Sequence, residues 1–214
     1  MCGRFSCSSL TFGKALLDIG VTNVSAFRFE PHFNVGPMDL HSVILKNKTQ
    51  IVVQPGRWGI TPQWRKNPTQ KIHNAKLETV GDKSTFKKAF LFQRCLIPVD
   101  GFYEWKQEGK IKQPYWFHQE GQEIFFLAGL YFVEEGELRF VVLTQEAKQP
   151  VASIHLRQPV IVHPSNAQDW LTMSGIANPI GLVDVDVRLE SRQVTRKVNN
   201  TTFDQPECIQ LDRT

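Results

Sequence analysis

The chain lacks the features that mark membrane, secreted and disulfide-bonded proteins. Its 214 residues contain no apolar run of 18 residues or more, so we expect no membrane span. The N-terminus shows no basic segment followed by an apolar one, so we expect no secretory signal. The four cysteines, Cys2, Cys7, Cys95 and Cys208, form no C-x-x-C pair. Their spacing argues against a zinc knuckle or a disulfide framework and suits a reducing, cytoplasmic compartment.

Repeats, low-complexity tracts and Ser/Gly-rich linkers are also missing, so we expect one domain over residues 1–214. Runs of β-branched and aromatic residues bounded by turn signals predict strands. These runs are 41–45, 50–54, 95–99, 114–118, 124–132, 138–144, 183–189 and 209–211. Apolar periodicity predicts short helices over 8–19, 85–92 and 165–171. The predicted fold class is α+β, dominated by a mostly antiparallel, barrel-like sheet with a few short flanking helices.

Some of these expectations concern single residues or connections. The first two strand runs should pair as a hairpin, and residues 25–37 should form an ordered loop. Ser84 should cap the second helix. The side chains expected to face the core from the first helix are Leu10, Ala15, Leu16 and Ile19.

Charge is unevenly spread although the net charge is only +4. Residues 57–112 hold twelve lysines and arginines against five acids, whereas residues 113–214 hold eight against thirteen. A basic middle region could form an electropositive face that attracts a polyanion such as nucleic acid. The alternative is a solvated surface of mixed charge, which charge counting leaves open.

The residue with the most distinctive chemistry is Cys2, directly behind Met1. If Met1 is removed, Cys2 carries an α-amine that titrates near pH ~8 beside a thiol that titrates near ~8.5. The two groups together can condense with an aldehyde and close a thiazolidine ring. The alternative is that Cys2 is an ordinary small buried residue, as free cysteines commonly are.

Three further segments concentrate reactive side chains, at 73–79, 99–106 and 153–160. Glu104 stands between Tyr103 and Trp105, so it is a candidate for a partly buried carboxyl group with a raised pKa, suited to proton transfer. The alternative is a surface acid on an alternating strand. His155 lies in an apolar stretch, where a histidine is more often structural than catalytic.

Six ordered segments together resemble the SOS-response-associated peptidase (SRAP) domain family, whose members shield abasic sites. The segments cover nearly the whole chain, and they are 2–5 (CGRF), 33–37 (FNVGP), 58–62 (WGITP), 74–79 (NAKLET), 101–105 (GFYEW) and 154–159 (IHLRQP). The resemblance raises the reactive interpretation of Cys2 above the structural one.

The resemblance implies a sensor and protector of abasic sites in single-stranded DNA, or at single-strand/duplex junctions. Cys2 would form a reversible cross-link, with its amine making a Schiff base and its thiol closing the thiazolidine. Glu104 would shuttle protons, and His155 would assist, including in reversal of the link. Asn74 would position the sugar or the Cys2 backbone. The resemblance implies no cofactor, no metal, no membrane partner, a monomer, and a cytoplasmic location associated with the nucleoid in a bacterium.

The resemblance also assigns DNA contacts. Lys76, Arg157 and Arg4 would contact phosphates. Flat apolar surface for stacking against bases would come from Pro37, Trp64, Trp105 and Phe86. Trp116 and Trp170 are assigned to the core. Arg4 and a basic cleft would favour the Cys2 thiolate, while DNA phosphates would oppose it, and the sequence leaves that balance open.

Two positions depart from the family pattern. Lys76 stands where arginine is usual, so the bidentate fork is lost while the charge is kept. Leu156 replaces a common acidic residue after His155, which puts the rate of cross-link reversal in doubt.

Two other functions stay open at this point. One is a thiol peptidase, or autopeptidase, that uses Cys2 with His155 and Glu104. The other is a non-covalent single-stranded DNA binding module, whose binding would be sensitive to salt and indifferent to a missing base. A metal enzyme is the weakest alternative, because the His and Cys spacings fit no common zinc pattern.

Overall fold

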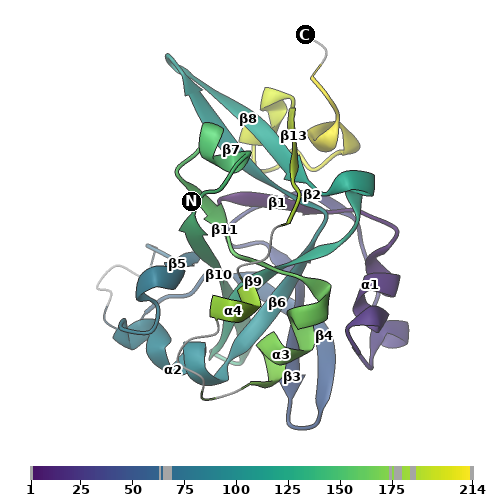
Figure 1. Ribbon diagram of the computed structural model, residues 1–214, viewed down its shortest axis with the longest axis vertical. Helices are drawn as coiled ribbons and strands as arrows, with labels where there is room; N and C mark the ends of the chain where they lie inside the picture. Colours follow the sequence, from purple (N-terminus) through teal and green to yellow (C-terminus); the bar gives the residue numbers. More distant parts are fainter. Residues whose placement is uncertain are drawn as a thin grey trace.

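The computed structural model describes residues 2–62, 64, 69–173, 175, 180–183 and 187–212. Strands dominate it, and the helices lie around them (Figure 1). The strands are β1 (Arg4–Cys7), β2 (His32–Val35), β3 (Leu40–Asn47), β4 (Gln50–Trp58), β5 (Asn74–Lys76), β6 (Arg94–Val99), β7 (Gly101–Glu108), β8 (Ile111–His118), β9 (Phe125–Glu134), β10 (Glu137–Glu146), β11 (Arg157–Pro159), β12 (Ile161–Val162) and β13 (Glu190–Gln193). The α-helices are α1 (Phe12–Asp18), α2 (Ser84–Phe92), α3 (Ala167–Thr172) and α4 (Ile180–Val183). The 3-10 turns are η1 (Val24–Ala26), η2 (Leu77–Thr79), η3 (Glu120–Gln122), η4 (Val151–Ser153), η5 (Pro164–Asn166), η6 (Arg196–Asn199) and η7 (Pro206–Ile209).

Five strands close into a ring. β10 pairs with β4, β4 with β3, β3 with β6, β6 with β9, and β9 returns to β10. The β10–β4 and β10–β5 pairings are parallel, and the other strand pairings described are antiparallel. The predicted fold class, an α+β structure built on a mostly antiparallel, barrel-like sheet, is therefore confirmed. Closure gives each of the five ring strands a paired neighbour on both sides, so the ring itself has no free edge.

Alternate residues of the ring belong to two different apolar clusters. Ile44 and Leu96 pack in a cluster that includes Leu16 of α1 and Trp170 of α3. The next residues along the same strands, such as Leu45 and Ile97, pack in a second cluster with Phe5 and Phe102. Because side chains alternate along a strand, the two clusters lie on opposite faces of the ring. One face is covered by helices and the other contacts the second sheet.

Gly129 of β9 lies tightly against the neighbouring strands β6 and β10. A Cβ atom there would lie 2.4 Å from Cδ1 of Ile97 and 2.9 Å from the carbonyl oxygen of Val141. No side chain fits that space, so the pairing of β9 with β6 and β10 depends on glycine at this position.

The second sheet, in the order β13-β8-β7-β1-β2, is antiparallel throughout and positions the N-terminus. Arg4 pairs with Tyr103 and Phe5 with Phe102. The register brings the residues just before β1 to the part of β7 that carries Glu104. Two of the segments singled out in the sequence therefore meet through backbone pairing.

The hairpin of β3 and β4 is confirmed over eight paired positions. The prediction for the first helix is only partly correct, because α1 begins at Phe12 and Leu10 is 97% exposed. Leu16 is fully buried as expected. Ser84 is the first residue of α2 rather than its cap; the cap position is Lys83, whose side chain makes no capping bond.

Three other expectations about where elements lie were wrong, because pairing with distant segments decides the structure there. Residues 25–37 are not all loop, since they contain β2, which is extended because it pairs with β1. The strand predicted over 183–189 is displaced: Val183 belongs to α4, residues 184–186 lie outside the described residues, and β13 follows at 190–193. No strand forms over 209–211, where Leu211 makes only an isolated bridge to Val194.

Among the helices in the described ranges, none has the length and apolar character needed to cross a membrane.

Candidate functional site

Cys2 is fully buried, and its backbone is anchored. Its carbonyl oxygen accepts a 2.7 Å hydrogen bond from Nδ2 of Asn74, while its thiol lies 3.8 Å from the carbonyl oxygen of Arg4. Burial raises the pKa of the Cys2 thiol well above its usual value, and the negative charge of Glu104 adds to the rise. The thiol is thus protonated at neutral pH, and a base is needed to activate it. Burial and Glu104, rather than Arg4, therefore dominate the pKa of the thiol in the DNA-free protein.

Asn74 reaches Cys2 from the barrel. It begins β5, which pairs in parallel with β10, with Asn74 opposite Val142. Its Oδ1 atom is buried and has no hydrogen-bond partner among the described residues. Buried amide oxygens rarely stay unpaired, so this acceptor is available to a donor group that enters beside Cys2.

Glu104 and His155 form the central pair of the site. The Glu104 side chain is only 2% exposed, and its Oε2 lies 3.5 Å from Nδ1 of His155. Burial raises the pKa of Glu104 to about 7. Burial lowers the pKa of His155, whose Nδ1 lies 2.9 Å from the carbonyl oxygen of Arg157. Glu104 is thus the buried carboxyl group predicted from its aromatic neighbours, and not a surface acid.

A cleft of about 600 Å³ opens over this pair. Its lining residues are Arg4, Glu104, Trp105, Gln107, Lys112, His155 and Asn199. The chain therefore brings four predicted site residues together from β1, from β7 and from the connection before β11. Sequence reasoning missed Gln107, Lys112 and Asn199, because nothing local to Asn199 indicates that the C-terminal region folds back onto β7 and β8.

Arg157, predicted to contact phosphate, already has a carboxylate partner. Its guanidinium donates to both oxygens of Glu78, at 2.6 and 3.0 Å, and to the carbonyl oxygen of Thr144 at 2.6 Å. The hydrogen bond from Arg157 lowers the pKa of Glu78. Lys76, two residues before Glu78, is exposed. Sequence reasoning missed the Glu78 partnership, although the acid lies in the same polar segment as Lys76.

The aromatic residues assigned to stacking lie in different places. Trp105 is half-buried in the cleft. Trp64 is 64% exposed, donates to Thr85 and lines a separate hollow. Phe86 is only 8% exposed and packs edge-on against Phe132, which argues against a stacking role for it. Trp116 and Trp170 are fully buried, as expected of core residues.

The Arg4 side chain passes close to Gly36. A Cβ atom at Gly36 would lie 2.9 Å from Nε of Arg4. The glycine therefore leaves room for the Arg4 side chain on its way to the cleft, and the half-buried Pro37 follows it directly.

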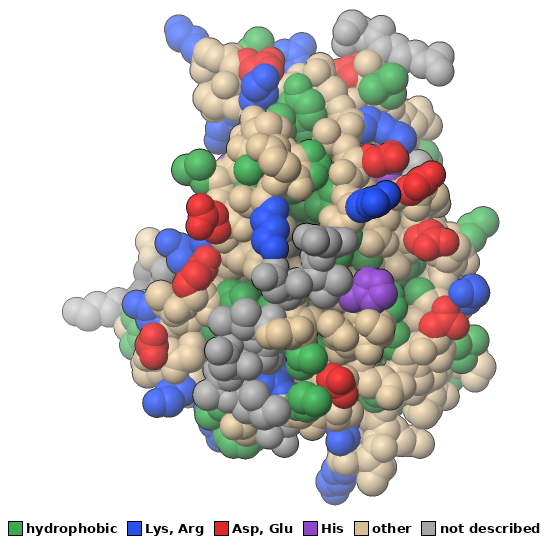
Figure 2. Space-filling model, viewed as in Figure 1, with side chains coloured by type: hydrophobic (Ala, Val, Ile, Leu, Met, Phe, Trp, Pro, Cys, Tyr) green, Lys and Arg blue, Asp and Glu red, His purple; other side chains and the backbone are tan. Residues whose placement is uncertain are grey.

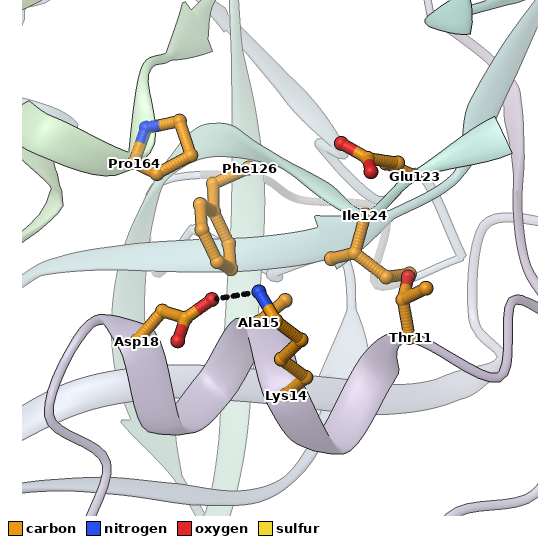
Figure 3. A pocket seen from close by; sticks show the side chains of 8 residues that line it. All are labelled: Thr11, Lys14, Ala15, Asp18, Glu123, Ile124, Phe126 and Pro164. Carbon is orange, nitrogen blue, oxygen red and sulfur yellow. Dashed lines mark hydrogen bonds and ion pairs between the residues drawn. The ribbon is translucent and has the colours of Figure 1, made fainter. Parts of the chain in front are cut away.

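The surface charge near these residues is mixed. Figure 2 shows basic and acidic side chains interspersed over the face it presents, so this face carries mixed charge rather than one sign. A smaller hollow of about 170 Å³ lies beside α1 (Figure 3), with Lys14 and Asp18 paired at its edge and Phe126 behind them. None of the predicted site residues lines this hollow beside α1.

The protein thus combines a ring of five strands with a second sheet whose first strand follows Cys2, and it pairs a buried glutamate with a partly exposed histidine. A family model described as "SOS response associated peptidase (SRAP)" matches residues 1–201, and the chain belongs to that family. It is 30% identical to the "Abasic site processing protein YoqW" of Bacillus subtilis, over 98% of this chain and 99% of that protein. It is 32% identical to the "Abasic site processing protein YedK" of Escherichia coli, over 80% and 79% of the two chains.

The fold has solved counterparts. A crystal structure of a Bacteroides thetaiotaomicron protein superposes with a TM-score of 0.77 at 20% identity, over 99% of this chain and 100% of that one. At that identity the likeness establishes the shared fold.

Proposed function

We propose that the protein recognises abasic sites in single-stranded DNA and cross-links to them through Cys2 after removal of Met1. Met1 itself lies outside the described residues. The observation that carries the proposal is the pair of buried Glu104 and partly exposed His155, which lines a cleft beside an anchored Cys2. The names of the relatives, abasic site processing proteins, point to the same substrate.

The proposed chemistry condenses an aldehyde with an aminothiol. The Cys2 amine adds to C1′ of the ring-opened deoxyribose, and loss of one water gives an imine. The thiol then adds to the imine carbon, its proton leaves for a base, and the nitrogen takes up a proton, so the five-membered ring closes with no further atom lost. A carboxyl group with a pKa of about 7 can both donate and accept protons at neutral pH, which suits Glu104 to both steps.

The other residues have supporting roles in the proposal. Asn74 holds the Cys2 carbonyl, so the amine points along a fixed direction. His155 exchanges protons with Glu104 and would assist reversal of the link. Arg4 and Lys76 would contact phosphates on either side of the missing base, and Trp64 and Trp105 would stack on neighbouring bases. Shielding the aldehyde in this way would protect the strand from cleavage by β-elimination.

A denaturing gel tests the proposal. A single-stranded oligonucleotide with one uracil, treated with uracil glycosylase, is mixed with purified protein whose intact mass shows that Met1 is absent. We expect a heat-stable shifted band that requires the abasic site. Borohydride reduction of the abasic site beforehand removes the aldehyde and should abolish the band. Cys2→Ser should abolish the stable adduct, whereas Cys95→Ser, at another buried cysteine, should keep it.

The remaining alternatives correspond to other outcomes of the same experiment. Salt-sensitive binding without an adduct, equal for intact and abasic strands, would favour the non-covalent module. Cleavage of a peptide by the wild type and not by Cys2→Ser, again without an adduct, would favour the thiol peptidase.

A further inference from the structure

The 33–37 segment marked out in the sequence has no part in the proposed chemistry, yet it makes several hydrogen bonds to the C-terminal part of the chain. Asn34 is 2% exposed, and its Nδ2 lies within hydrogen-bond distance of three carbonyl oxygens, those of Val198, Asn200 and Phe203. Asp204 reciprocates, since its carboxylate accepts hydrogen bonds from the backbone N–H groups of Phe33 and Asn34. These bonds fix the chain over residues 198–204, which we call the C-terminal clamp.

The C-terminal clamp lies against the strands that carry the cleft. Figure 1 shows the C-terminal turns beside β7 and β8. A third apolar cluster forms there, in which Trp105 packs with Tyr103, Val198 and Phe203. The same indole lines the cleft. One side of Trp105 is therefore supported by the clamp, while another is presented to whatever enters the cleft.

Asn199 connects the clamp to the indole. Its Oδ1 accepts a 2.6 Å hydrogen bond from Nε1 of Trp105, and its Nδ2 donates to the carbonyl oxygen of Lys112 at 3.3 Å. An indole N–H can only donate and a backbone carbonyl can only accept, so this amide has a single orientation that satisfies both partners. The amide thus bridges β7 and β8 and fixes the edge of the Trp105 ring.

We infer that Asn199 is a positioning residue that holds Trp105 as a preformed stacking platform for the nucleotide next to the abasic sugar. The inference rests on the proposed function. A cleft of about 600 Å³ is larger than a base-free sugar needs, and Trp105, Gln107, Lys112 and Asn199 line the part not occupied by Glu104 and His155. An indole fixed before DNA arrives loses less conformational freedom on binding, so the tether raises affinity without touching the chemistry.

The tether itself can be measured without DNA. The five tryptophans give five indole N–H signals in a ¹H–¹⁵N spectrum of the labelled chain, and Trp105→Phe identifies one of them. We expect Asn199→Ala to shift the Trp105 signal and to speed its hydrogen exchange about five- to tenfold. Asn200→Ala is the matched control, because the hydrogen bonds described for that side chain go to Thr202, and it should leave the signal in place. An unmoved signal in Asn199→Ala overturns the inference.

The consequence for DNA is measured by fluorescence anisotropy with an unmodified single-stranded oligonucleotide. Asn199→Ala should weaken binding about three- to tenfold, part of the effect of removing a stacking aromatic. In a Trp105→Ala background it should cause no further loss. If Asn199→Ala weakens DNA binding by the same factor in the Trp105→Ala background as in the wild type, Asn199 acts on DNA independently of Trp105 and the inference fails.

The adduct assay separates positioning from chemistry. At saturating abasic oligonucleotide the rate constant for adduct formation by Asn199→Ala should equal that of the wild type. If the wild type neither binds single-stranded DNA nor forms an adduct, the proposed function fails, while the indole signal still decides whether Asn199 tethers Trp105.

Discussion

Oε2 of Glu104 lies 3.5 Å from Nδ1 of His155. Burial raises the pKa of Glu104 and lowers the pKa of His155, so it favours the neutral form of each group. Two neutral partners at this distance can share one proton, whereas a carboxylate facing an imidazolium would hold it as an ion pair. The pair is therefore able to give and take protons near pH 7. The predictions below test this arrangement and the contacts around it.

Removing the Glu104 carboxyl group should change how stability depends on pH. Its pKa is about 7 in the folded protein against an ordinary 4.5, so between these values the folded state binds the proton more tightly. Wild-type stability should therefore fall as pH rises from 4.5 to about 7, by about 2–3 kcal/mol at most. Glu104→Gln lacks this loss, so its stability relative to the wild type should rise over the same window and then level off.

Urea unfolding at pH 5, 6, 7 and 8 measures this difference. Glu108→Gln is the control, because that acid lies on the same strand and is exposed. A pH-independent difference between Glu104→Gln and the wild type would show that the carboxyl group has an ordinary pKa.

Asn74→Ala should slow adduct formation while leaving affinity for unmodified single strands nearly unchanged. The variant loses the 2.7 Å bond that holds the Cys2 carbonyl, and misplacement of a nucleophile by about 1 Å can cost a factor of about 100. We expect a reduction of about 10- to 100-fold in a single-turnover gel time course at saturating DNA. Asn47→Ala, at an exposed end of β3, should behave as the wild type. An equal loss in affinity and in rate would mean that Asn74 serves DNA binding instead.

Glu78→Gln should raise affinity for single-stranded DNA. Glu78 engages Arg157 through two hydrogen bonds, and a phosphate has to compete with that carboxylate for the guanidinium. Glu78 is half-exposed, so the competition is modest, and we expect a gain of about two- to fivefold at low salt that fades as salt increases. Anisotropy titrations at several salt concentrations measure it. Unchanged or weaker binding would show that Arg157 is a structural residue held by Glu78 and not a phosphate contact.

Gly129→Ala should severely destabilise the barrel. The added methyl would lie 2.4 Å from Cδ1 of Ile97 and 2.9 Å from a backbone oxygen, so β9 would have to separate from its neighbours. We expect a loss of about 3 kcal/mol or more in urea unfolding. Gly13→Ala is the matched control, because its nearest contact is 4.0 Å away and it lies in α1, where alanine is favourable. A Gly129→Ala variant as stable as the wild type would contradict the tight packing of the ring.

The sequence by itself determined the fold class, the β3–β4 hairpin and the central strands, because alternating β-branched runs and turn residues are local signals. It also indicated a buried carboxyl group at Glu104 from its aromatic neighbours, and the burial of Trp116 and Trp170. The resemblance of its ordered motifs to the SRAP family predicted that Cys2, Asn74, Glu104 and His155 act together.

Only the tertiary structure decided which of these residues meet and how each is tuned. The raised pKa of Cys2, the carboxylate already bound to Arg157 and the burial of Phe86 all depend on neighbours far along the chain. Asn199 and Trp105 are 94 positions apart, and their hydrogen bond forms next to the segment that Asn34 binds. Local composition contains no information about such pairings, because desolvation and hydrogen bonding depend on what the completed fold brings within a few ångströms.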